Sequence, residues 1–233
     1  MFDDFNGALA HRWHQTCIGG GTLLAGETTV RMAFDAARQG NYTDAQIDDY
    51  GRLPRSQFPW RPPLHMEVSA RASLPAASLT GSADQAHTLR GTAGFGFWNY
   101  PFSVRGDPLM LPEAVWFFYA SPPSNMALVP GVPGWGWKAQ VVHSMRPATL
   151  AAALPLAVTT ALGVLSGNSR PAGRWMQRLT GAQEALLDVE ITDWHTYELE
   201  WHSQEALFWV DGETGIARAA AAGASTRIRG LAR

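Results

Sequence analysis

The chain has 233 residues, 46% of them apolar, which is enough material for a sizeable core in a single β-sandwich domain. Its formal net charge of -2 leaves no basic excess to neutralise phosphates, so we expect no nucleic-acid partner. The single cysteine, Cys17, excludes an intramolecular disulfide framework and a multi-cysteine zinc site. The acidic N-terminus has no apolar run behind a basic start, which predicts no signal peptide and, by default, a cytoplasmic protein.

Short alternating segments bounded by turn residues predict antiparallel strands in the first part of the chain. A first strand is expected near Trp13, a hairpin over Thr22–Ala33 and a half-buried strand over Asn41–Asp49. A proline-rich loop follows. Leu64–Leu74 then alternates again, with apolar residues at even positions and mostly polar residues at odd ones. These segments favour an all-β class.

The two most aromatic runs are Gly91–Tyr100 and Ala114–Ala120, each about one strand long. Continuous aromatic and β-branched runs are typical of strands that are buried on both faces, so we expect both in the middle of a packed sheet. Gly131–Val142 carries Trp135 and Trp137, which would share one side of any strand formed there.

A short helical insertion is expected around residues 150–187. Leu150–Gly167 is uncharged but contains Pro155, and it is shorter than the roughly 20 residues that a membrane span needs. We therefore interpret it as a helix or a buried cover and expect no membrane partner. Arg174–Leu187 has a composition compatible with a second helix.

Asp193–Gly212 predicts a β-hairpin. Trp194–Trp201 places Tyr197 and Leu199 on one face and acidic residues on the other, and an apolar run follows at Leu207–Val210. The pair Asp211-Gly212 is a strong signal for a type I′ turn, which should send the chain towards a further partner strand.

Three segments resemble glycoside hydrolase family 16, and they occur in the family's order. Asp193–Gly212 reads DWHTYELEWHSQEALFWVDG, and Gly94–Phe102 reads GFGFWNYPF. Tyr42–Tyr50 reads YTDAQIDDY and precedes LHMEVSARASL at Leu64–Leu74. The resemblance implies a concanavalin A-like fold, an antiparallel two-sheet jelly-roll sandwich, over residues 1–212.

The resemblance also raises an expectation about catalysis. Family 16 retaining hydrolases carry Glu-x-Asp-x-Glu on one strand, which puts three carboxylates on one face. The corresponding strand here has Glu113, but Val115 and Phe117 occupy the other two positions. We therefore predict that the family mechanism does not operate. Other carboxylates could act as a relocated acid/base pair. The alternative for them is that they lie on a solvated outer face of the sandwich and have no catalytic role. The candidates are Glu113, Asp44, Asp48 and Glu67.

Sugar binding needs aromatic rings that stack on C–H faces and planar polar groups that bond to hydroxyls. The residues that we predict for this role combine both types, with the alternative that about half of the aromatic ones belong to the core. They are Trp98, Asn99, Tyr100, Trp116, Trp135, Trp137 and His195. For His195 the alternative is a strand-end histidine bonded to backbone.

The preferred function is therefore a carbohydrate-binding β-sandwich whose partner is a polysaccharide or oligosaccharide. Two alternatives stay open: a glycoside hydrolase with relocated acid/base residues, and a non-catalytic structural or interaction domain. We expect no cofactor and no metal site, although the sequence leaves a structural calcium open.

Residues 213–233 form an atypical tail that is rich in alanine and arginine and low in β propensity. It is either a natural terminal helix or disordered end, or the product of a reading-frame shift near Glu213 that replaced the final strands. In the second case the sandwich would have an exposed edge.

Overall fold

The computed structural model describes residues 1–34, 41–54, 57–77, 87–99, 113–124, 126–143, 182–214 and 219–220. These residues form antiparallel strands with almost no helix, which confirms the expected all-β class. None of the described helical residues belongs to a helix long and apolar enough to cross a membrane.

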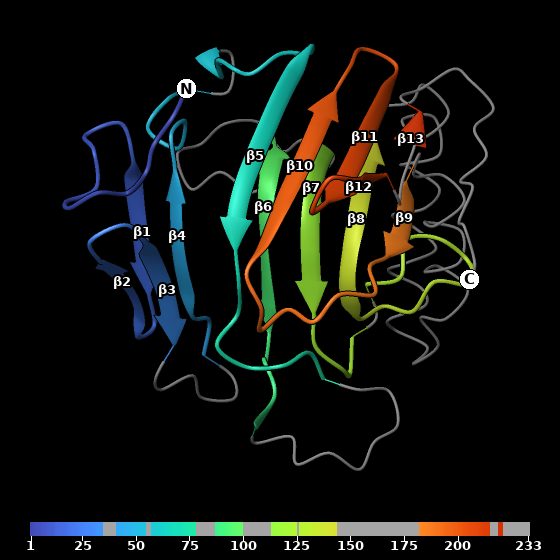
Figure 1. The fold of residues 1–233 in the computed structure, drawn as a ribbon, viewed down its shortest axis with the longest axis horizontal. Helices are drawn as coiled ribbons and strands as arrows, with labels where there is room; N and C mark the ends of the chain where they lie inside the picture. The colour runs from blue at the N-terminus through green and yellow to red at the C-terminus, as the bar shows by residue number, and fades with distance from the viewer. Residues whose placement is uncertain are drawn as a thin grey trace, which may run out of the picture. The chain divides into compact units, whose positions relative to one another are not determined.

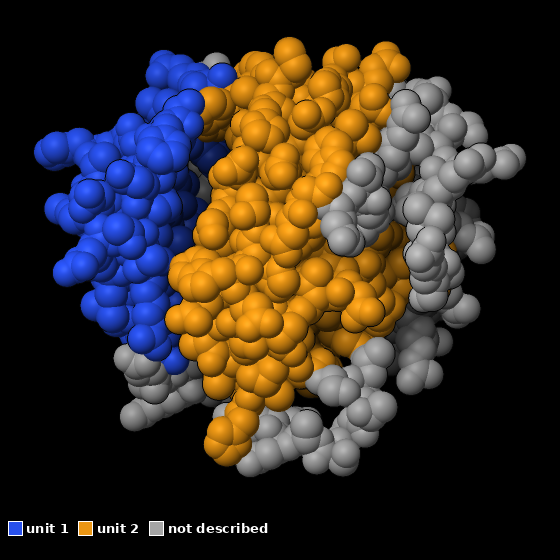
Figure 2. Space-filling model, in the orientation of Figure 1, with its two compact units in different colours: residues 1–59 blue, residues 60–233 orange. Residues whose placement is uncertain are grey.

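The chain divides into two compact units, Met1–Pro59 and Trp60–Arg233 (Figure 2). The boundary falls inside the proline-rich loop that the sequence predicts. No change of composition in the sequence marks this boundary.

The first unit consists of two strand pairs. β1 (His14–Ile18) pairs with β4 (Asp44–Asp48), and β2 (Gly21–Ala25) pairs with β3 (Val30–Phe34). The first strand, the hairpin and the half-buried strand that the sequence predicts are thus confirmed in this part of the chain.

One sheet of the second unit contains the predicted hairpin, and we call it the hairpin sheet. Its order is β12-β11-β10-β5, with a short β13 (Ala219–Ala220) that also pairs with β11 (Figure 1). The strands are β5 (Leu64–Ala70), β10 (His195–Trp201), β11 (Glu205–Val210) and β12 (Glu213–Thr214). The hairpin of β10 and β11 is confirmed.

The turn between β11 and β12 has the predicted type I′ character. Asp211 and Gly212 both have positive φ, 54° and 70°, which this turn requires. Its partner strand β12 is Glu213–Thr214 in the described part of the chain. The rest of the tail, 215–218 and 221–233, lies outside the described residues, so both explanations of its composition stay open.

The other sheet of the second unit is the aromatic sheet, with the order β6-β7-β8-β9. Its strands are β6 (Thr92–Trp98), β7 (Glu113–Ala120), β8 (Gly136–His143) and β9 (Gln183–Leu186). β7 is buried along most of its length, as predicted. The same prediction for the preceding aromatic run is wrong, because among the described strands β6 pairs only with β7, at the end of the sheet, and its residues are exposed or only partly buried.

β9 corrects part of the predicted helical insertion. Gln183–Leu186 consists of good helix formers, yet it is a strand paired antiparallel to β8. Its intrinsic preference is overridden by the edge of β8, which would otherwise leave backbone donors and acceptors unpaired. The remainder of the predicted insertion, 150–181, lies outside the described residues.

The core of the second unit lies between the two sheets, in a sandwich-like architecture (Figure 1). Phe117 of β7 is fully buried at its centre. Its ring centroid lies 5.0 Å from that of Tyr197 and 5.2 Å from that of Phe208, both in the hairpin sheet. Within its own sheet it lies 5.5 Å from Phe95. Phe117 therefore contacts aromatic side chains of both sheets.

Candidate functional site: the outer face of the aromatic sheet

Alternation along the strands gives the aromatic sheet an outer face, opposite the core. Trp116, Gln140 and Glu184 lie on this face and form one row across β7, β8 and β9, because each is the register partner of the next. On β6, Gly96 continues the row beside Trp116. A polar amide and a carboxylate are therefore placed next to an indole by strand pairing alone.

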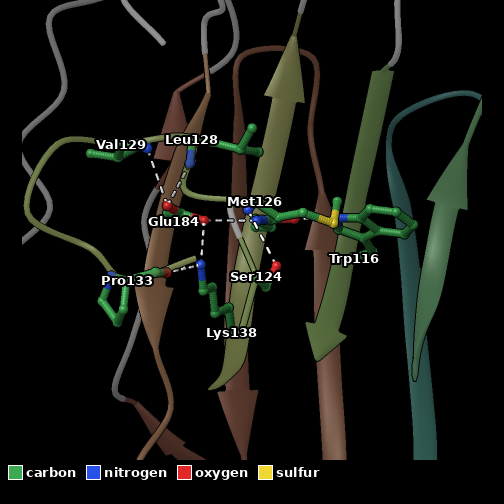
Figure 3. A network of polar contacts seen from close by, with 9 residues as sticks. Trp116, Ser124, Met126, Leu128, Val129, Pro133, Lys138 and Glu184 are labelled. Carbon is green, nitrogen blue, oxygen red and sulfur yellow. Dashed lines mark hydrogen bonds and ion pairs between the residues drawn. The ribbon is translucent and has the colours of Figure 1, made fainter. Parts of the chain in front are cut away.

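A chain of hydrogen bonds follows this row (Figure 3). The indole Nε1 of Trp116 donates to Oε1 of Gln140 at 2.8 Å. Nε2 of Gln140 then donates to Oε2 of Glu184 at 2.7 Å. Since the amide of Gln140 is used at both ends, the ring of Trp116 is held in one orientation.

Glu184 is the centre of a buried polar network. Nζ of Lys138 lies 3.0 Å from its Oε2, and the backbone N–H groups of Leu128 and Val129 donate to its Oε1 at 3.0 and 3.1 Å (Figure 3). Lys138 also donates to the carbonyl of Pro133. The side chains of Lys138 and Glu184 are fully buried. We conclude that Glu184 binds the loop before β8 to the sheet and is not accessible as an acid or base.

An aromatic row adjoins the network. Trp98 meets Trp116 edge-on, with centroids 5.1 Å apart and planes at 85°. Trp116 stacks on Phe118 at 4.9 Å with planes at 21°. Trp98 and Trp116 remain partly accessible, whereas Phe118 is buried.

Gly96 makes the close approach of β6 to Trp116 possible. Its φ is +150°, and a Cβ placed there would lie 2.5 Å from both Cα and Cβ of Trp116. Only glycine avoids this contact. At Gly96, β6 therefore presents backbone and no side chain beside Trp116.

The structure brings some of the predicted sugar-binding residues together. Trp98 and Trp116 form the edge-on pair described above. Asn99 follows Trp98, and its Oδ1 accepts a hydrogen bond from the backbone N–H of Glu113 at 3.1 Å. This bond joins the end of β6 to the start of β7. Tyr100 lies outside the described residues.

The other two predicted tryptophans do not join this pair. Trp137 is 8% exposed and packs in the core, 5.7 Å from Phe95 and 5.6 Å from Tyr197 between ring centroids. It is part of the packed interior, the alternative that the sequence left open. Trp135 precedes β8 and is partly buried, and its Nε1 has no hydrogen-bond partner among the described residues.

His195 serves the hairpin. Its Nδ1 lies 2.6 Å from Oδ2 of Asp211, and its Nε2 lies 2.9 Å from the carbonyl of Glu190. Two acceptors favour the doubly protonated ring, and the bond to Asp211 is the main reason why the pKa of His195 is raised. The same bond lowers the pKa of Asp211. The backbone-bonded alternative for this histidine is thus realised.

This pair predicts a pH-dependent contribution to stability. The pKa of His195 is raised above 6.5, so its contribution is complete below pH 6.5 and disappears as the pH rises through the folded value. The pKa of Asp211 is lowered from 3.8, so its contribution is complete above that value and is lost in stronger acid. We expect the Tm difference between the parent and His195→Gln to be largest between these two values.

The matched variant for this measurement is Asp211→Asn, because asparagine tolerates the positive φ of the turn. At pH 5 its Tm should fall below that of the parent, as the Tm of His195→Gln does. A Tm difference that stays constant from pH 4 to pH 9, a range that brackets the ordinary pKa values of both groups, would contradict the assignment.

The candidate Glu113 lies on the face of β7 that points towards the core. Glu113 shares its parity with Val115 and Phe117, and both of these lie in the core between the sheets. The outward positions of β7 carry Ala114, Trp116, Phe118 and Ala120. Neither face of this strand therefore presents a second carboxylate to a ligand.

The remaining predicted carboxylates do not form a facing pair within either unit. Asp44 and Asp48 share a face of β4 but are four residues apart, roughly 13 Å along a strand, which exceeds the spacing of either glycosidase mechanism. Burial raises the pKa of Asp44. Asp48 is buried and accepts hydrogen bonds from the backbone of Tyr50 and Gly51, which indicates a turn-stabilising role. Glu67 lies in the hairpin sheet, opposite Glu198 of β10 and not on the aromatic sheet.

Gln140, Glu184 and Lys138 were not among the residues predicted from the sequence. A signal was present for two of them: Lys138 is the only lysine of the chain, and it shares a face with Gln140 in a strand that is apolar apart from these two residues and the terminal His143. No such signal marks Glu184, because its segment has a helix-like composition.

Comparisons with known proteins add no assignment. A scan of family models, a search of curated proteins and a search of solved structures each return no match to this chain.

Proposed function

We propose that this chain is a carbohydrate-binding β-sandwich of the concanavalin A-like type, related to glycoside hydrolase family 16, that binds its ligand without cleaving it. The observation that carries the proposal is the pair Trp98 and Trp116 on the outer face of the aromatic sheet, with the indole of Trp116 oriented by Gln140. The sandwich-like arrangement of the two sheets supports the jelly-roll assignment.

Sugar rings suit this face for a physical reason. An indole presents a flat apolar surface to the C–H face of a pyranose, and an indole that is already fixed loses little rotamer freedom on binding. Trp98 and Trp116 stand nearly perpendicular, so together they form a corner and not a flat platform. A corner favours a ring that stacks on one indole while its edge meets the other.

We expect binding without hydrolysis because the carboxylate of Glu184 on this face is buried and already hydrogen-bonded within the protein. Both oxygens of Glu184 accept hydrogen bonds, and its side chain is buried. Retaining cleavage needs two carboxyl groups about 5–5.5 Å apart across the sugar. We therefore expect glucan, galactan and xylan to be recovered intact, with no release of reducing ends.

Trp98→Ala tests the proposal by isothermal titration against soluble glucan, galactan and xylan. We expect the parent to bind at least one polymer and the variant to bind it at least about tenfold more weakly, since central aromatic residues carry much of the free energy of binding. Trp194→Ala is the matched control. Trp194 lies directly before β10 of the hairpin sheet and is 52% exposed. Among the described residues, its ring interacts only with Arg71.

Two results would overturn the proposal. One is a parent chain that binds none of the three polymers. The other is an equal loss of affinity in Trp98→Ala and in the control Trp194→Ala, which would separate binding from the outer face of the aromatic sheet.

A further inference from the structure

The hairpin sheet carries a cluster of metal-ligating side chains on its solvent-facing side. His65 and Glu67 are two residues apart on β5, so they share a face. Glu198 of β10 is the register partner of Glu67 and therefore lies on the same face. Nε2 of His65 and Oε2 of Glu198 are 3.7 Å apart, and one ligand atom from each of the three residues lies within 4.8 Å of the others.

The two glutamates need a positive partner. Like charges directly opposite each other on neighbouring strands destabilise a sheet. In the part of the chain that the structure describes, neither Glu67 nor Glu198 forms an ion pair with a lysine or an arginine, and Glu198 meets only the imidazole of His65. A bound cation would convert the repulsion into attraction.

We propose that His65, Glu67 and Glu198 bind a divalent transition metal ion of the Zn²⁺ type. One imidazole nitrogen and two carboxylate oxygens are a ligand set that zinc accepts, whereas calcium takes six to eight oxygens. Ligands at about 2.0–2.2 Å from zinc stand roughly 3.5 Å apart in tetrahedral geometry. The separation of 3.7 Å between His65 and Glu198 is close to that value.

The site is independent of the carbohydrate proposal, because it lies on the other sheet. Three protein ligands leave a coordination position for water, and the side chains of His65 and Glu198 are 51% and 31% exposed. The ion can therefore reach the site directly from solvent.

Titration with zinc chloride alone, on the full chain treated with a chelator and dialysed, tests the assignment. We expect one saturable site whose affinity falls at least about tenfold in His65→Ala and in Glu67→Gln, since even loss of an outer partner of a metal ligand costs that much. His202→Ala is the matched control, because His202 lies just past β10 and bonds Glu200 at 3.1 Å, outside the three ligands. It should bind zinc as the parent does.

Thermal unfolding is a second test, in which Glu67→Gln weakens zinc binding without lowering the stability of the metal-free chain. Without metal, Glu67→Gln should unfold at a temperature no lower than the parent, because the repulsion with Glu198 is removed. At one zinc concentration, zinc should raise the Tm of the parent by more than that of Glu67→Gln. Absence of saturable binding, unchanged affinity in His65→Ala, or an equal loss in His202→Ala would each overturn the proposal.

Discussion

Glu184→Gln is expected to destabilise the folded chain by about 3–5 kcal/mol. The substitution keeps the shape of the side chain but leaves the ammonium of Lys138 buried without its counter-charge. Only the carbonyl of Pro133 would still accept from Lys138 among the contacts described for it. Urea unfolding followed by tryptophan fluorescence measures the loss, and Trp116 would report it directly through Gln140.

Lys138→Met should cost less than Glu184→Gln. In that variant Glu184 keeps three of its donors, the two backbone N–H groups and the amide of Gln140. The double variant should be less destabilised than the sum of the two single losses, since removing both charges leaves neither unpaired. A Glu184→Gln protein that unfolds within 1 kcal/mol of the parent, below the usual cost of an uncompensated buried charge, would contradict the role assigned to this pair.

Phe117→Ala is the second large effect, with an expected loss of about 3–5 kcal/mol. The ring is fully buried and contacts aromatic side chains of both sheets, so its removal leaves a cavity that neither sheet can fill alone. Equilibrium unfolding in urea gives the free energy. The slope of the transition should stay close to the parent's, since a cavity lowers stability without changing the surface exposed on unfolding.

Phe117→Leu and Leu24→Ala are the two controls, and both should be less destabilised than Phe117→Ala. The first keeps much of the volume and should cost less than about 1.5 kcal/mol. The second removes a side chain that is 56% exposed in the first unit and should change stability by no more than about 0.5 kcal/mol. If Phe117→Ala were as mild as Leu24→Ala, the proposed packing of one sheet on the other would be wrong.

The candidate site was only half accessible to sequence reasoning. Trp98 and Trp116 could be nominated because aromatic residues next to an amide suit a sugar. Trp137 was nominated on the same grounds, yet it lies in the core. The difference is which face of a strand points inwards. On β8 the polar Lys138 and Gln140 lie on the outer face, so alternation places Trp137 on the inner one. β7 is apolar at nearly every position and shows no such alternation.

What the sequence determined by itself was local. Alternation over five to eight residues predicts where strands lie, and the positive φ required by Asp211-Gly212 predicts the turn, because both effects act between near neighbours. Tertiary structure decided what depends on distant partners. It made a strand of Gln183–Leu186, whose residues favour a helix, by offering the edge of β8. It also joined Glu184 to Lys138, 46 residues apart, since only strand register brings such charges into contact.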